Sequence, residues 1–191
     1  MNTFSNYRNS TLCAALAGLI ALTAPASQAT DGPHHPLEIA ALMMQMPLPV
    51  LVGLATGWVA ADLGVPMPET LPRVAFADEA TMRVIRAAAE GDPAGAATPD
   101  ATMVAMYDSR SGTIFLPLGW TGQSTAEVSI LVHEIVHHFQ LLSGERLACP
   151  AEREKQAYAV QGRWLEGHGE SLETALGISP MFLLVATNCM F

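Results

Sequence analysis

The chain has 191 residues, half of them hydrophobic, and its nine Lys and Arg residues stand against 18 Asp and Glu residues, a formal net charge of −9. Because this acidic balance provides no basic surface for a phosphate backbone, it argues against a nucleic-acid-binding protein. The length suits one domain with a substantial hydrophobic core.

The first thirty residues resemble an export signal more than a folded element. Arg8 supplies a basic start, residues 11–22 form an uncharged apolar run, and Ser27 and Ala29 are small residues at the positions that a signal peptidase reads. We therefore expect residues 1–29 to be a signal peptide cleaved after about Ala29, and the mature chain to be periplasmic or secreted. The alternative is a retained membrane anchor, although the apolar run is short for a span.

The mature chain, residues 30–191, is expected to form a single domain, and its first part is strongly apolar. Residues 39–61 contain no charged side chain, which by itself would suit a membrane span. Pro47 and Pro49 interrupt this run, so we expect two helices, over residues 36–46 and 49–62. They would pack as an apolar hairpin or lie exposed as a lid.

The middle of the chain predicts a small amount of β-structure. Residues 73–77 are expected to form a short strand, after which Asp78 caps a helix to about residue 90. Two further apolar segments, residues 102–107 and 113–117, are joined by a turn sequence and predict a β-hairpin.

The next helix has clear sequence signals at both ends. Ser124 and Glu127 form a capping box, which places its start near Thr125. Ser143 and Gly144 are expected to end it.

Inside this helix, His133, Glu134 and His137 form an HExxH motif. Since an α-helix has 3.6 residues per turn, the two imidazoles lie on one face, where both can reach one Zn²⁺ ion. Glu134 lies beside them and is the candidate general base, as in zinc peptidases. His138 lies about 100° around the helix and is expected to be a packing or surface residue.

A catalytic zinc needs a third protein ligand, and a helix starting at Pro150 offers Glu152 and Glu154. Glu154 shares its helix face with mostly apolar residues and should point into the domain, whereas Glu152 should face water. A carboxylate on an apolar face needs a cation, so Glu154 is the predicted third ligand. The alternative cation is an arginine, such as Arg153 or Arg163.

The two cysteines of the mature chain, Cys149 and Cys189, are expected to form a disulfide, as an isolated pair in an exported protein usually does. Two separate buried thiols are the alternative. Ser179 and Pro180 are expected to start a last apolar helix before Cys189.

An HExxH helix preceded by a hairpin and followed by a helix bearing Glu-x-x-Ala resembles the gluzincin branch of zinc metallopeptidases, and more narrowly its small bacterial members. The resemblance covers about residues 102–165. It implies a zincin-like fold, and substrate binding by β-addition along residues 112–117. It also implies Zn²⁺ ligands at His133, His137 and Glu154, and a general base at Glu134.

Two features depart from that family. Tyr158 stands where an acidic residue often follows the Ala, so the outer partners of the ligand histidines are unassigned. The spacing also identifies no donor for a developing oxyanion, and Tyr107, Tyr158 and His168 are all candidates.

Together these features predict an α+β, zincin-like domain, mostly helical, with a small antiparallel sheet before the metal-binding helix. The leading hypothesis is an exported zinc-dependent peptidase that acts on peptide or protein substrates. The second is a catalytically inactive zinc-binding structural or interaction module derived from a peptidase. The third is a non-metal helical protein whose residues 39–61 bind a partner or a membrane surface. The oligomeric state is not indicated.

Overall fold

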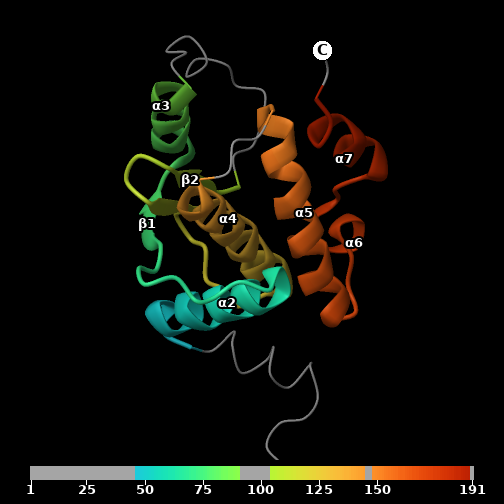
Figure 1. Cartoon of the computed structure of the whole chain (residues 1–191), viewed down its shortest axis with the longest axis horizontal. Helices are drawn as coiled ribbons and strands as arrows, with labels where there is room; N and C mark the ends of the chain where they lie inside the picture. Colours follow the sequence, from blue (N-terminus) through green and yellow to red (C-terminus); the bar gives the residue numbers. More distant parts are fainter. Residues whose placement is uncertain (1–45, 91–103, 145–147, 190–191) are drawn as a thin grey trace, which may run out of the picture. The chain divides into compact units, whose positions relative to one another are not determined.

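The computed structural model describes residues 46–90, 104–144 and 148–189 (Figure 1). The chain separates into two compact units, Met1–Gly32 and Pro33–Phe191, and the described residues all belong to the second. The expected signal peptide and nearly all of the helix expected over residues 36–46 lie outside them. The described part is mainly helical with one three-stranded sheet, which confirms the α+β class.

The first described helix, α2 (Leu48–Leu63), confirms the second of the two helices expected in the apolar segment. It begins directly after Pro47 and ends at Gly64, which adopts a left-handed conformation with φ 68°. One face of α2, including Ala55 and Val59, is buried in the main core. Among the described residues, no helix is long and apolar enough to cross a membrane.

The sheet consists of β1 (Arg73–Ala77), β2 (Met106–Asp108) and β3 (Thr113–Pro117), in the order β1-β3-β2. β2 and β3 form the expected antiparallel hairpin. β1 pairs in parallel with β3, so the sheet is mixed and not purely antiparallel as predicted. The long connection from β1 through α3 (Glu79–Glu90) is what allows this parallel pairing.

The position of β3 corrects one expectation. Strand β3 is hydrogen-bonded on both sides, to β1 and to β2, so residues 113–117 have no free edge for a substrate strand. The edge strands of the described sheet are β1 and β2.

Helix α4 (Thr125–Ser143) has the boundaries that its capping residues predict. The hydroxyl of Ser124 accepts the backbone N–H of Glu127 at 3.1 Å. The Glu127 carboxylate in turn accepts the N–H groups of Thr121 and Gln123, both at 3.1 Å, and so fixes the approach to the helix. Gly144 ends the helix with φ 63°.

Helix α4 is also the centre of the core, since it packs against α2, α5 and both strands of the hairpin (Figure 1). Its side chains are buried on almost every side, and Leu131, Ile135 and Val136 are fully inaccessible. The helix that carries the HExxH motif is therefore the most firmly packed element of the described structure.

The C-terminal part consists of α5 (Pro150–Gly167), α6 (Leu172–Leu176) and α7 (Pro180–Ala186). The short helix α6 was not predicted, although Ser171 and Thr174 form a capping box at its start. Cys149, immediately before α5, is bonded to Cys189, after α7, with 6.0 Å between their Cα atoms. The predicted disulfide pairing is thus present in the structure.

Replacing Cys149 and Cys189 together by Ser is expected to lower the free energy of unfolding by up to about 4 kcal/mol, because the bridge closes a loop of 40 residues. Urea unfolding followed by tryptophan fluorescence measures the loss. The wild-type protein in excess reductant should unfold at the same midpoint as the double variant. An unchanged midpoint, or two free thiols in non-reducing peptide maps, would contradict the stabilising bridge.

Candidate metal centre

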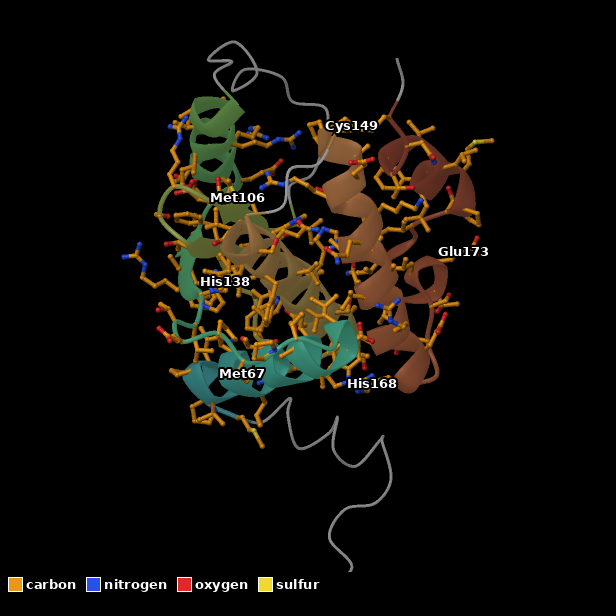
Figure 2. All side chains as sticks on the ribbon, viewed as in Figure 1. Met67, Met106, His138, Cys149, His168 and Glu173 are labelled. Atoms are coloured by element: carbon orange, nitrogen blue, oxygen red, sulfur yellow. A yellow bond between two sulfur atoms is a disulfide. The ribbon has the colours of Figure 1, made fainter. Side chains whose placement is uncertain are left out.

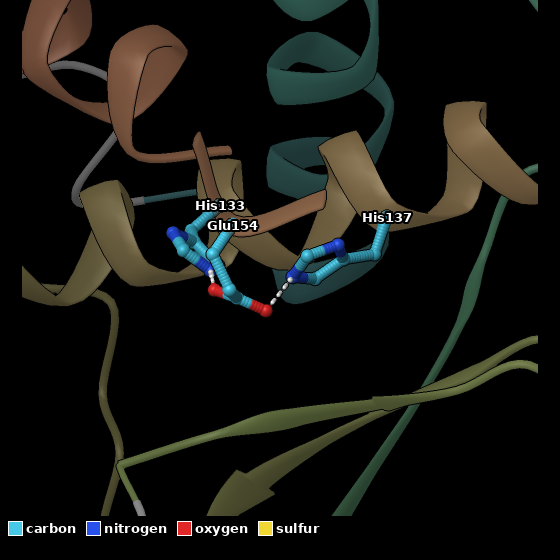
Figure 3. A group of neighbouring side chains, drawn as sticks. All are labelled: His133, His137 and Glu154. Atoms are coloured by element: carbon cyan, nitrogen blue, oxygen red, sulfur yellow. Dashed lines mark hydrogen bonds and ion pairs between the residues drawn. The ribbon is translucent and has the colours of Figure 1, made fainter. Parts of the chain in front are cut away.

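Three side chains from α4 and α5 converge on one point, as Figure 3 shows. His133 Nε2 lies 3.1 Å from one carboxylate oxygen of Glu154, and His137 Nε2 lies 3.4 Å from the other. One candidate ligand atom from each of the three residues lies within 4.8 Å of the other two. Among the described residues, this is the group that could hold a metal ion.

The two candidate acidic residues of α5 separate as the helix geometry predicts. Glu154 turns toward the paired histidines, whereas the Glu152 carboxylate accepts the backbone N–H of Ala148 at 2.7 Å, ahead of the helix. Only Glu154 joins the converging group.

The outer nitrogen of His133 is held by an amide side chain. Its Nδ1 lies 3.0 Å from Oε1 of Gln161. The amide nitrogen of Gln161 donates to the Ser129 hydroxyl at 3.1 Å, and that hydroxyl donates to the Ala126 carbonyl at 2.7 Å. This series of hydrogen bonds fixes the orientation of the amide, so Gln161 Oε1 is the acceptor for His133. In the neutral imidazole, Nδ1 of His133 therefore carries the proton and Nε2 keeps a free lone pair.

The same arrangement recurs at His137. Its Nδ1 lies 2.8 Å from Oε1 of Gln140, while the amide nitrogen of Gln140 donates to the Arg153 carbonyl at 3.0 Å and to the Gln156 side chain at 2.9 Å. A carbonyl oxygen can only accept, so Gln140 Oε1 is the acceptor for His137. The proton of His137 therefore also lies on Nδ1, and its Nε2 also faces the group with a lone pair.

With both imidazoles neutral, three electron-pair donors would face one another without a proton between them. Such an arrangement is repulsive unless a cation lies at its centre or an additional proton occupies the 3.1 Å contact between His133 Nε2 and Glu154. Of the two arginines named as partners for Glu154, Arg163 is engaged elsewhere, because it forms a two-pronged ion pair with Asp62, at 2.8 and 2.6 Å. The charge of another arginine, Arg86, helps to lower the pKa of Glu154. Two neutral imidazole nitrogens and one carboxylate are a ligand set that suits Zn²⁺, so the residues present fit this ion.

The pKa shifts of His133 and Glu154 also favour a positive charge between these residues. Burial opposes a charge on His133, but its hydrogen bond to Glu154 and the neighbouring carboxylates outweigh this effect and raise its pKa. Burial acts to raise the pKa of Glu154, but the hydrogen bond from His133 and the charges of both imidazoles lower it. A shared proton and a metal ion therefore compete for the same position.

The group is open to solvent on one side. The side chains of His133 and His137 retain 10% and 14% of their accessible surface, whereas that of Glu154 retains 37%. A metal ion held there would keep access to water from the side of Glu154, as a catalytic site requires and a closed structural site does not.

Glu134 lies beside this group but not within it. Its side chain is buried, and burial raises the pKa of its carboxyl. Its neighbours include both candidate ligand histidines and the backbone N–H of Tyr107 in β2, which donates to the carboxylate. Glu134 is therefore a carboxylate held in a defined position next to the converging donors.

Of the three candidate oxyanion donors, Tyr107 is already engaged. His138 Nε2 donates to the Thr70 carbonyl at 2.9 Å, so its Nδ1 is an acceptor and receives the Tyr107 hydroxyl at 2.9 Å. His138 is buried and ties β2 to the segment before β1. It is a packing histidine, as expected, and not a ligand.

His168 does not reach the candidate centre. It lies at the end of α5 opposite to Cys149, whereas Glu154 is in the early turns of that helix (Figure 2). Its Nδ1 lies 2.6 Å from the Trp164 carbonyl, and its ring lies against the Trp164 indole with 4.4 Å between centroids. Its role is to close the C-terminal end of α5.

Tyr158 is the candidate that remains at the site. Its ring contacts the His133 imidazole with 4.6 Å between centroids, and its hydroxyl makes no hydrogen bond to any described residue. Burial, followed by the charges of Glu154 and Glu134, raises the pKa of Tyr158 to about 12. The phenol therefore keeps its proton and can donate it in a hydrogen bond to an incoming group.

Fold and site together define an α+β protein with a candidate metal centre of two histidines and one glutamate. The chain belongs to the family described as Domain of unknown function (DUF6647), whose model matches residues 45–190. Comparisons with curated proteins and with solved structures found no match. The matched range includes every residue of the candidate centre.

The two glutamines are the functional residues that sequence reasoning missed. Helical periodicity puts Gln161 on the same face of α5 as Glu154, but the outer partner of a zinc-bound histidine is often an acidic residue, so the sequence did not single out a glutamine. Gln140 lies one helical turn after His137, a spacing at which two side chains on a helix can meet. The signals available in the sequence were therefore the helix face that Gln161 shares with Glu154 and the three-residue spacing of Gln140 from His137.

If the centre holds a metal ion, replacing Gln161 by Leu is expected to weaken its binding, measured with Zn²⁺, by about 10- to 100-fold, because His133 loses the acceptor that fixes its tautomer and ring orientation. Competition with a chromogenic chelator measures the affinity. Gln123→Leu is the matched control, because Gln123 is exposed and lies before α4, and this variant should keep the wild-type metal affinity. His137→Ala should remove binding altogether. Equal affinities for Gln161→Leu and wild type would contradict the assigned role.

Proposed function

We propose that this chain is an exported zinc-dependent metallopeptidase that hydrolyses peptide bonds. The observation that carries the proposal is the convergence of three candidate ligand atoms, from His133, His137 and Glu154, beside a buried carboxylate at Glu134. The three donors would hold the Zn²⁺ ion. When bound, the ion supplies Lewis acidity, which acidifies water and polarises a substrate carbonyl.

In this proposal, Glu134 is the general base. Its carboxylate accepts a proton from the attacking water and later transfers it to the leaving amine. The raised pKa of Glu134, caused by burial, brings this group closer to the pKa at which accepting and returning a proton are balanced. The N–H of Tyr107 fixes the carboxylate while the proton moves.

Tyr158 is assigned the role of oxyanion donor. Its hydroxyl bonds to none of the other described residues, stays protonated and belongs to a ring that lies against a candidate ligand. A donor already in position when negative charge develops on the carbonyl oxygen stabilises the transition state more than the ground state.

The resemblance to small gluzincins supports the proposal, because His133, Glu134, His137 and Glu154 occupy the positions of the family's motif residues. The cysteine bridge accords with an oxidising compartment and hence with export. A substrate bound by β-addition would use the edge strand β2, whose Tyr107 reaches Glu134, since β3 is covered on both sides.

Replacing Glu134 by Gln is expected to abolish peptide hydrolysis while Zn²⁺ binding persists, since the amide keeps the shape of the side chain but cannot accept the proton. Digestion of a broad peptide library, analysed by mass spectrometry, provides the readout, and metal analysis provides the control. If wild type and variant both bind Zn²⁺ but cleave nothing, the non-catalytic zinc-binding module becomes the correct description.

Replacing Tyr158 by Phe is expected to lower kcat by about 10²- to 10³-fold with little change in KM, because only the oxyanion contact is lost. The ring and its contact with His133 remain, so metal affinity and thermal stability should stay at wild-type values. Steady-state kinetics on a peptide identified from the library test this. An unchanged kcat would exclude Tyr158 as the donor.

A further inference from the structure

The helix α7 carries an exposed aromatic ring close to the candidate centre. Phe182 lies edge-on to the Tyr158 ring with 6.2 Å between centroids, and Tyr158 in turn contacts His133. Half of the Phe182 surface is nevertheless accessible to solvent. The two rings thus form one aromatic wall, defined here as Tyr158 and Phe182, that leads from the converging donors to the surface.

This wall is held in place by several independent contacts. The Ser179 hydroxyl caps α7 by accepting the N–H of Phe182 at 3.2 Å, and α7 packs against α5. The bridge between Cys149 and Cys189 ties the segment after α7 to the start of α5. Because these contacts fix the backbone that carries Phe182, covering its exposed ring orders little additional chain.

The chemistry of the wall selects an apolar occupant. The sequence from Thr174 to the end of the chain contains no Asp, Glu, Lys or Arg, although the chain as a whole has a net charge of −9. A charged side chain placed against these rings would lose hydration without gaining an ionic partner from α7, whereas an apolar one gains by burying its surface and that of Phe182.

From these contacts we infer that the wall of Tyr158 and Phe182 is a subsite that receives a bulky apolar side chain of a peptide bound at the candidate metal centre. The inference rests on the metal site of the proposed function and names its substrate class. Phe182 is the specificity-determining residue, since Tyr158 contacts the ligand imidazole and Phe182 contributes the accessible surface.

Two metal-directed probes test the subsite without any hydrolysis. N-acetylphenylalanine hydroxamate and N-acetylglycine hydroxamate present the same zinc-binding group and differ only in the side chain beside it. With the Zn²⁺-loaded protein, calorimetry should give tighter binding of the phenylalanine compound by on the order of tenfold, through burial of two apolar surfaces. Phe182→Ala should reduce this ratio to about threefold or less, and Phe182→Leu should retain most of it.

Leu184→Ala is the matched control, because Leu184 is also exposed on α7 but points to the opposite side of that helix from Phe182. The Leu184→Ala variant should keep the wild-type ratio of affinities for the two hydroxamates. A wild-type ratio near one, or a ratio that Phe182→Ala leaves unchanged, overturns the inference. If Phe182→Ala instead dissociates a dimer in sedimentation velocity and leaves the ratio unchanged, the wall is an interface between copies of the chain, and the inference is also overturned.

The measurement separates this inference from the proposed function. A protein that prefers the phenylalanine hydroxamate but cleaves no peptide contradicts the peptidase and supports the subsite. A protein that cleaves peptides but binds both hydroxamates equally supports the peptidase and contradicts the subsite. A protein that binds neither probe overturns both.

Discussion

Two imidazole lone pairs and one carboxylate are forced toward a common point by the surrounding hydrogen bonds, and the candidate centre depends on this constraint. Gln161 and Gln140 hold the protons of His133 and His137 on Nδ1, so neither histidine can relieve the convergence by turning its N–H inward. Only a cation or an additional proton at the centre offsets the repulsion. The arrangement is therefore informative about chemistry as well as about packing.

The rest of the fold serves to keep these groups where they are. Helix α4 is fixed at its start by Ser124 and Glu127 and buried on nearly all sides, so its two histidines have little freedom. Helix α5 brings Glu154 to them and is cross-linked to the chain beyond α7 through Cys149. The sheet contributes through β2, which joins α4 by the N–H of Tyr107 and by the contact of its hydroxyl with His138.

Local signals made much of this predictable. Capping residues and prolines gave both ends of α2 and α4 and the start of α5 to within a residue or two, and helical periodicity distinguished Glu154 from Glu152. The parallel pairing of β1 with β3 was not predictable, because it depends on a long connection and not on any local pattern. The roles of Gln140 and Gln161 also depend on contacts between helices. For the same reason, only the structure could place His168 away from the centre and Tyr158 beside it.

The neutrality of the two glutamine amides has an electronic consequence. A carboxylate behind a ligand histidine donates electron density through the ring, whereas an amide oxygen fixes the ring without adding a negative charge. A divalent ion held by two neutral imidazoles and one carboxylate would thus retain a formal charge of about +1, with no further anion hydrogen-bonded behind its histidines. Such a centre sacrifices some affinity for its ion and leaves that ion a stronger electrophile.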